Sequence, residues 1–166
     1  FGKGTMAQLY SAIDTRTSWF QNLLLLFRRP SRLQIAALCH RLRDGEREVL
    51  LVTTKSTHRW ILPKGWPIMS LKAHHTAAVE AFEEAGVIGN AQKKPFASFQ
   101  SHKGGEGGLQ LRTEVLVFLV DVESTTSSFP DKDERDVRWL PIQEAMRLAG
   151  DPGLVKVLRK LENLPN

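Results

Sequence analysis

The chain has 166 residues, of which 42% are hydrophobic and 25% charged, and these proportions are typical of one soluble globular domain. Its net charge of +5 favours anionic partners such as nucleotides, polyphosphates or nucleic acid, without selecting among them. The single cysteine, Cys39, excludes an intrachain disulfide, so we expect a reducing, cytoplasmic setting with Cys39 as a core residue.

The N-terminal part of the chain differs from the rest. Residues 1–5 precede Met6 and are interpreted as a remnant of an expression tag, and residues 6–31 as a helical extension. The apolar stretch of this extension is shorter than the about 20 residues that a membrane-spanning helix needs, and no signal-peptide cleavage site follows it. We therefore expect no membrane span. The extension is expected to pack on the domain or on the partner in a possible homodimer, with attachment to a membrane surface as the alternative.

Residues 32–166 are expected to form one domain, whose first half contains strands and a helix. The turn sequence Asp44-Gly45 between two apolar runs predicts a β-hairpin. A helix is predicted over residues 71–84, with Ser70 as its N-cap and Gly86 as the left-handed residue after its end. The strands predicted in this half cover residues 33–42, 48–53 and 60–63.

The second half continues the alternation of strands and helices. Strands are predicted over residues 87–100 with a break at 93–95, over 111–122 and over 139–141; loops over 103–108 and 124–133; and helices over 142–149 and 153–164. This order predicts an α/β fold in which helices cover both faces of a mixed β-sheet, an α/β/α sandwich.

Three glutamates stand at the end of the predicted helix. Glu80, Glu83 and Glu84 follow an i, i+3, i+4 spacing, which places their carboxylates on one helix face within one turn. Like charges at this separation repel one another, and a hard divalent cation with oxygen ligands removes the conflict. A solvated acidic helix end is the alternative reading of the three residues taken alone.

The surrounding residues resemble the signature of the Nudix hydrolase family, G-x5-E-x7-R-E-U-x-E-E-x-G-U, where U is aliphatic. The matching positions are Gly65, Glu80, Ala81, Glu83, Glu84, Gly86 and Val87. Within the family the chain looks most like the diphosphoinositol polyphosphate and diadenosine polyphosphate hydrolases. The segments that carry this likeness are residues 48–54, 59–63, 77–87, 112–113 and 138–145.

The resemblance implies a Nudix-type sandwich and the hydrolysis of a P–O–P linkage in a nucleoside or inositol diphosphate joined to another group. It implies that Glu80 and Glu84, with the backbone carbonyl of Gly65, hold Mg²⁺ or Mn²⁺. It also implies that Glu83 is the general base, although base and ligand roles exchange among family members. A phosphorylated small molecule is therefore the expected partner.

Cations outside the motif are expected to bind the substrate phosphates. Arg112 opens a strand at the position where the related hydrolases place a phosphate-binding arginine, and further candidates are Lys55, Arg59, Lys64 and Arg135. Trp66 replaces a glycine of the related hydrolases, and its indole is expected either to stack on a base or to cap the core.

Two positions depart from the signature. Leu71 stands where the family has a glutamate and Val79 where it has an arginine, and these two residues form an ion pair in the family. Because both charges are absent together, neither is left unpaired. We expect Leu71 and Val79 to brace the loop before the helix by apolar contact.

Two other functions compete with hydrolysis. A Nudix-fold module that binds a nucleotide or a protein without catalysis accords with the two departures. A nucleic-acid-binding protein accords only with the basic charge, and the sequence has no groove-reading motif, so we expect no specific nucleic-acid partner.

Overall fold

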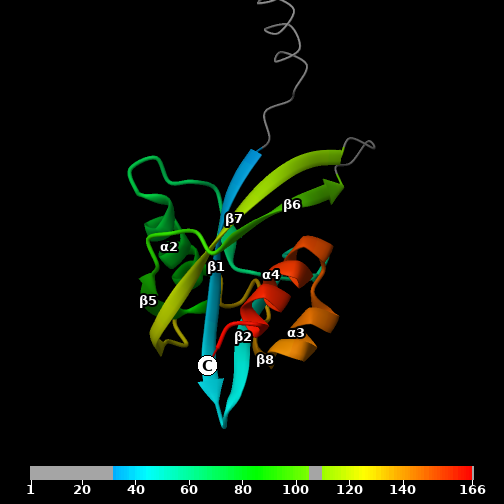
Figure 1. The fold of residues 1–166 in the computed structure, drawn as a ribbon. Helices are drawn as coiled ribbons and strands as arrows, with labels where there is room; N and C mark the ends of the chain where they lie inside the picture. The colour runs from blue at the N-terminus through cyan, green and yellow to red at the C-terminus, as the bar shows by residue number, and fades with distance from the viewer. Residues whose placement is uncertain (1–31, 105–109, 166) are drawn as a thin grey trace, which may run out of the picture. The chain divides into compact units, whose positions relative to one another are not determined.

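The computed structural model describes residues 32–104 and 110–165 (Figure 1). The predicted N-terminal extension and most of the predicted loop over residues 103–108 lie outside these ranges. Within the described part of the chain, no helix combines the length and the apolar character needed to cross a bilayer.

One mixed sheet contains all the described strands: β1 (Arg32–Arg43), β2 (Glu46–Thr53), β3 (Trp60–Ile61), β4 (Lys64–Gly65), β5 (Val87–Ala91), β6 (Ala97–Gly104), β7 (Gln110–Thr125) and β8 (Val137–Pro141). Its main path runs β3-β2-β1-β7-β5, while β4 pairs with β1, β6 with β7, and β8 with β2. The central strands β1 and β7 are parallel, and the other pairings are antiparallel. The predicted mixed sheet is therefore confirmed.

The predicted hairpin joins β1 to β2. Asp44 and Gly45 have φ angles of 52° and 81°, both in the left-handed region that a two-residue hairpin turn requires. Aspartate and glycine tolerate this region better than most residues, which is why the turn forms here.

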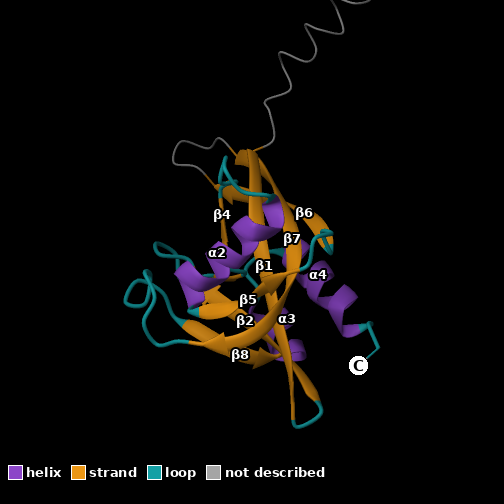
Figure 2. Cartoon of the chain, turned by 90° about the vertical axis from the view of Figure 1, so that its left-hand side faces the viewer, coloured by secondary structure: helices purple, strands orange, loops and turns teal. Residues whose placement is uncertain are grey.

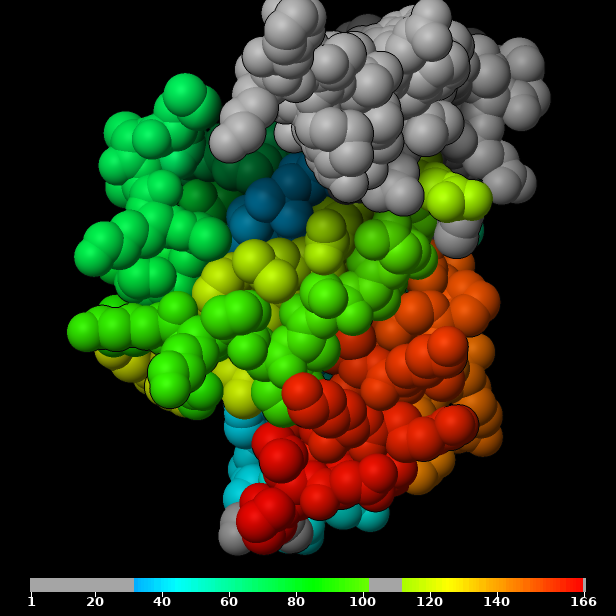
Figure 3. All heavy atoms as spheres, turned by 45° about the horizontal axis from the view of Figure 1, so that its top comes forward, coloured from blue at the N-terminus to red at the C-terminus, as the bar shows by residue number. Residues whose placement is uncertain are grey.

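Helices cover both faces of the sheet, as Figure 2 shows. The helix α2 (Ala73–Ala85) lies on one face, and α3 (Ile142–Leu148) and α4 (Pro152–Glu162) lie on the other. On the second face, α4 and β6 lie side by side and line a shared surface groove (Figure 3). The predicted α/β/α arrangement is therefore confirmed.

The alternation of side chains along β1 produces two hydrophobic clusters. Ala36 and Leu38 pack with α3 and α4, whereas Ile35, Ala37 and Cys39 pack with α2. Cys39 is fully buried as predicted, and its burial raises the pKa of the thiol to about 12. A thiol held protonated in this way is a poor nucleophile, which accords with a role of Cys39 in the core.

Only the C-terminal end of α2 matches the boundary predicted from the sequence. Gly86 ends the helix with a φ of 66°, as predicted. At the other end Ser70 is not the N-cap, because Lys72 occupies that position and no side chain caps the helix. Ser70 instead belongs to a turn closed by a 2.9 Å hydrogen bond from the Leu71 N–H to the Ile68 carbonyl, which delays the helix.

The small side chains of α2 allow the helix to approach the sheet closely. Ala77, Ala81 and Ala85 are buried against it. Phe82, the next residue along the helix, is 38% exposed and lies off this face. The close approach matters because it places the end of α2 beside β4.

Candidate active site

The three glutamates of α2 lie in different environments. Glu84 is buried, Glu80 is half-buried, and Glu83 is exposed. The common helix face that the spacing predicts therefore runs from the protein interior to solvent, and each carboxylate has its own partners.

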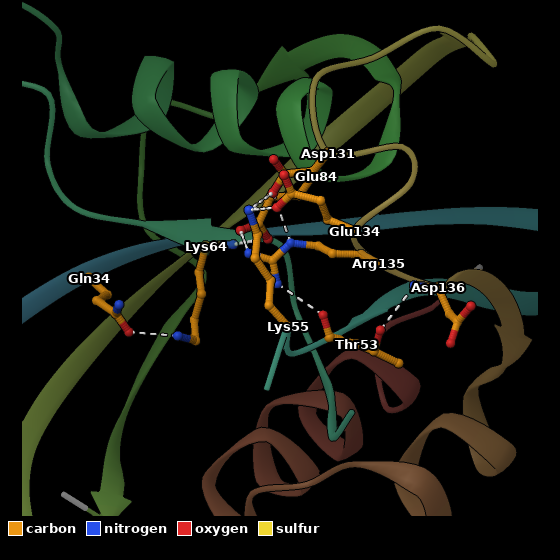
Figure 4. Close-up of polar contacts among 9 residues, drawn as sticks. All are labelled: Gln34, Thr53, Lys55, Lys64, Glu84, Asp131, Glu134, Arg135 and Asp136. Carbon is orange, nitrogen blue, oxygen red and sulfur yellow. Dashed lines mark hydrogen bonds and ion pairs between the residues drawn. The ribbon is translucent and has the colours of Figure 1, made fainter. Parts of the chain in front are cut away.

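Glu84 is held by contacts to both of its oxygens (Figure 4). Its Oε1 accepts a hydrogen bond of 2.6 Å from Nη2 of Arg135, and its Oε2 accepts one of 3.1 Å from the backbone N–H of Lys64. Burial raises the pKa of Glu84, and Arg135 and the Lys64 N–H offset part of that rise. The carboxylate is thus fixed in orientation between β4 and the loop before β8.

Glu80 lies directly against Gly65. A Cβ atom added to Gly65 would stand 1.9 Å from Oε1 of Glu80 and 2.4 Å from its Cδ, so any other residue there would force this carboxylate to move. Burial, followed by the charges of Glu84 and Glu83, raises the pKa of Glu80 to about 7. The matching glycine of the sequence motif therefore has a steric reason here.

Arg135 is the centre of a polar network. Besides Glu84, its Nε donates to Asp131 over 3.0 Å and its Nη1 donates to the Thr53 carbonyl over 2.9 Å. Asp131 also accepts a salt bridge of 3.2 Å from Lys55. Burial alone would raise the pKa of Asp131, but its hydrogen bonds to Arg135 and Lys55 hold it below the usual range.

Sequence reasoning missed two acidic members of this network, Asp131 and Glu134. Both form salt bridges with Lys55. Their only sequence signal is the i, i+4 spacing of Asp131 and Arg135, which ordinarily indicates a surface helix pair. Here the segment is a loop that places Arg135 against α2, and this placement depends on the tertiary fold.

A cleft of about 430 Å³ opens beside Glu84. Its cationic lining consists of Arg32, Lys55, Arg59, Lys64 and Arg135. Its apolar lining includes Ile61, Leu62, Trp66, Phe99 and Leu154, and its polar lining includes Gln34, Ser101, Thr113 and Asp151. A cleft with this lining is suited to an anion that carries an apolar or aromatic part.

Most of the predicted phosphate-binding residues meet at this cleft. Lys55, Arg59, Lys64 and Arg135 all line it. Arg112 is exposed and is not among the described residues of the lining, whereas its neighbour Thr113 is. Because successive side chains of a strand point to opposite faces, Arg112 faces away from the cleft that Thr113 lines.

The loop before α2 is held by polar contacts. The hydroxyl of the buried Thr76 accepts a hydrogen bond of 3.3 Å from the Ile68 N–H. Leu71 is 39% exposed, Val79 is half-buried, and neither belongs to the two hydrophobic clusters. The structure thus shows a polar contact between this loop and α2 at Thr76, and the apolar brace between Leu71 and Val79 stays a prediction.

The carboxylates fit a divalent metal in chemistry but only partly in arrangement. Glu80 and Glu84 offer the oxygen donors that Mg²⁺ and Mn²⁺ prefer. Among residues 32–104 and 110–165, no three His, Cys, Asp or Glu side chains converge as a ready-made metal cluster. Both oxygens of Glu84 accept hydrogen bonds from protein donors, and the carboxylate of Glu80 lies beside them against Gly65.

Known proteins similar to this chain include mitochondrial Nudix hydrolases of Arabidopsis thaliana. Nudix hydrolase 13 is 28% identical over 110 residues, which cover 63% of this chain and 54% of that protein. Nudix hydrolase 18 is 27% identical over 120 residues, which cover 70% of this chain and 62% of that protein. The chain thus spans little more than half the length of these relatives.

Solved structures share the fold at lower sequence identity. The C. elegans Ap4A hydrolase superposes with a TM-score of 0.60 at 18% identity, covering 80% of this chain and 96% of that one. The NUDIX domain of Shewanella oneidensis NrtR, solved with ADP ribose, superposes with a TM-score of 0.60 at 16% identity, covering 84% of this chain and 96% of that one. The NUDIX domain model matches residues 32–161, which confirms the resemblance seen in the glutamate motif, and the chain belongs to the Nudix family.

Proposed function

We propose that this protein is a metal-dependent hydrolase that cleaves a P–O–P linkage in a nucleoside or inositol diphosphate joined to another group. Dinucleoside polyphosphates and inositol pyrophosphates are the favoured compounds. The observation that carries the proposal is the position of Glu84, a buried carboxylate beside Glu80, in the wall of a cleft lined by cations. A binding protein for an anion has no need of buried carboxylates beside its ligand.

The roles of the carboxylates follow from their environments. Glu80 and Glu84, with the carbonyl of Gly65, would hold Mg²⁺ or Mn²⁺. When bound, the ion neutralises phosphate charge and acidifies the attacking water. The exposed Glu83 is the proposed general base, because a carboxylate open to solvent can take the proton of that water and release it.

The cleft cations divide into two groups. Arg59 is exposed on the cleft wall and is the proposed contact to the substrate phosphates, together with Lys64 and Lys55. Arg135 differs from Lys55, whose salt bridges lie on a half-exposed side chain, because its own side chain is largely buried and its three contacts go to protein acceptors. We therefore assign Arg135 to the positioning of Glu84. Arg112 is not included, because it faces away from the cleft.

The test is release of phosphate or nucleotide from a panel of diphosphate compounds with Mg²⁺, with Mn²⁺ and with chelator. We expect metal-dependent turnover of one compound, which is lost in Glu83→Gln and kept in the control Glu46→Gln. Glu46 suits the control because it is an exposed glutamate at the β1–β2 hairpin, outside the cleft lining. Turnover that survives in Glu83→Gln would remove Glu83 from the base role, and turnover in chelator would refute metal dependence.

A nucleotide-binding module without catalysis is the second candidate function. It is favoured by the contacts of Glu84, because Arg135 and the Lys64 N–H already satisfy both oxygens that the metal requires. If no compound of the panel is hydrolysed while a nucleotide still binds in the cleft, this function is supported over hydrolysis.

A further inference from the structure

Trp66 is a large aromatic side chain at the cleft that the fold does not bury. Its side chain is 51% exposed although it lines the cleft, and it belongs to neither hydrophobic cluster. Of the two roles expected from the sequence, this exposure favours stacking over capping the core. An exposed indole beside a cationic cleft is a surface suited to stacking.

The backbone holds Trp66 close to the carboxylates. It follows Lys64, whose N–H binds Glu84, and Gly65, on which Glu80 lies. It precedes Pro67, and the residue before a proline is confined to extended conformations. The ring is thus presented from a restricted backbone, which reduces the conformational entropy that ligand binding would cost.

Arg32 supplies a cation next to this ring. Its guanidinium carbon lies 6.0 Å from the centroid of the Trp66 ring, and both side chains line the cleft. A guanidinium over an indole limits the motion of the ring and remains able to donate to an anion. The pair therefore offers one flat aromatic surface and one positive group.

We propose that Trp66 and Arg32 form a subsite for the base of a nucleotide substrate, with the indole as the stacking surface. This inference rests on the proposed function and selects within it, because an inositol ring has no flat π-surface to stack. The phosphates would then extend from Trp66 past Lys64 toward Glu84, along the cationic lining. Any of the common bases fits such a surface, since stacking reads a π-face rather than a hydrogen-bond pattern.

The test compares binding of adenosine 5′-monophosphate with that of ribose 5-phosphate, which has the same phosphate and sugar but no base. Binding is measured by calorimetry on the full chain, so the result does not depend on turnover. We expect wild type to bind the nucleotide more tightly. In Trp66→Leu the nucleotide affinity should fall about 5- to 100-fold, which is the usual effect of losing one stacked base, while ribose 5-phosphate binding is unchanged.

Two further variants separate stacking from a general loss of structure. Trp66→Phe keeps a ring and should retain most of the nucleotide affinity. Met69→Ala removes a fully exposed apolar side chain of the same loop, outside the cleft lining, and should leave both ligands unaffected. Melting temperatures of all the variants should stay close to wild type, since Trp66 is half exposed.

Several results would overturn the proposal. Equal binding of the two ligands by wild type would mean that no base subsite exists. An equal loss of both ligands in Trp66→Leu would assign Trp66 to the shape of the loop instead. The subsite and the proposed function can fail separately. A protein that binds the nucleotide through Trp66 but releases nothing from any diphosphate would keep the subsite and refute the proposed function. A protein that cleaves inositol pyrophosphates without binding nucleotides would keep the function and refute the subsite.

Discussion

Replacing Arg135 by methionine removes the cation from the buried carboxylate of Glu84 while keeping a side chain of similar length. The side chains of Arg135 and Glu84 are 12% and 7% exposed, so their 2.6 Å contact is largely shielded from water. Loss of one partner from a buried pair typically costs about 3–5 kcal/mol. Glu84 keeps its contact to the Lys64 N–H, and burial already favours its protonation, so we expect the lower end of that range, about 3 kcal/mol.

The assay is thermal and urea unfolding in chelator near neutral pH. For a domain of this size the expected loss corresponds to a melting temperature lower by about 6–12 °C. Arg43→Met is the matched control, because the Arg43–Asp44 pair lies at 4.0 Å with side chains 65% and 95% exposed. Such a surface pair contributes little, so the control should melt with wild type.

A double-mutant cycle isolates the pair from the other contacts of Arg135. Glu84→Gln with Arg135→Met removes both charges, and it should recover a large part of the stability lost in Arg135→Met alone. The hydrogen bonds of Arg135 to Asp131 and Thr53 are absent from both Arg135 variants and cancel in the cycle. A single variant that melts within about 1 °C of wild type, or a double variant whose loss is the sum of the two single losses, would refute the assigned coupling.

Two further predictions concern Glu80. Gly65→Ala places a Cβ atom 1.9 Å from Oε1 of Glu80, so the carboxylate must move, and calorimetric titration should show weaker Mn²⁺ binding than in wild type. The control is Gly45→Ala, where an added Cβ atom meets nothing within 4 Å but the φ of +81° is strained for alanine. This control should lose stability without losing metal affinity. Because burial and the neighbouring carboxylates raise the pKa of Glu80 from 4.5 to about 7, the folded protein holds a proton in this window that the unfolded chain has released. The metal-free protein should therefore lose stability as the pH rises from about 4.5 to 7. In thermal melts between these pH values, Glu80→Gln should reduce the dependence of the melting temperature on pH. An unchanged dependence would assign the titration to other groups.

Features set by short-range patterns were predictable from the sequence. The Asp44-Gly45 turn and the alternation of side chains along β1 each depend on a few neighbouring residues, and the structure has both. Gly86 ends α2 for a similarly local reason, its positive φ. The start of α2 was not predictable in this way, because Ser70 takes part in the turn between Ile68 and Leu71 and the helix begins only after that turn.

The partners of the carboxylates were beyond sequence reasoning. Arg135 and Glu84 are 51 residues apart, and no periodic pattern links them. The spacing of Glu80, Glu83 and Glu84 predicts a common face, but it carries no information on how deeply each residue is buried. That depth comes from the packing of α2 against β1 and β4.

The strand β4 explains why so much of the site depends on so short a segment. It contains only Lys64 and Gly65, and it pairs with β1 through Gly65 opposite Ile35 and Lys64 opposite Ala36, both buried. Two residues are too few to show a strand pattern, so the sequence gives no sign of this pairing. Once β4 is fixed to the central strand, the Lys64 N–H meets Glu84, Gly65 admits Glu80, and Trp66 follows at the cleft. The central sheet thereby sets the positions of two carboxylates and one aromatic ring through a single pairing, and a change of register there would displace all three together.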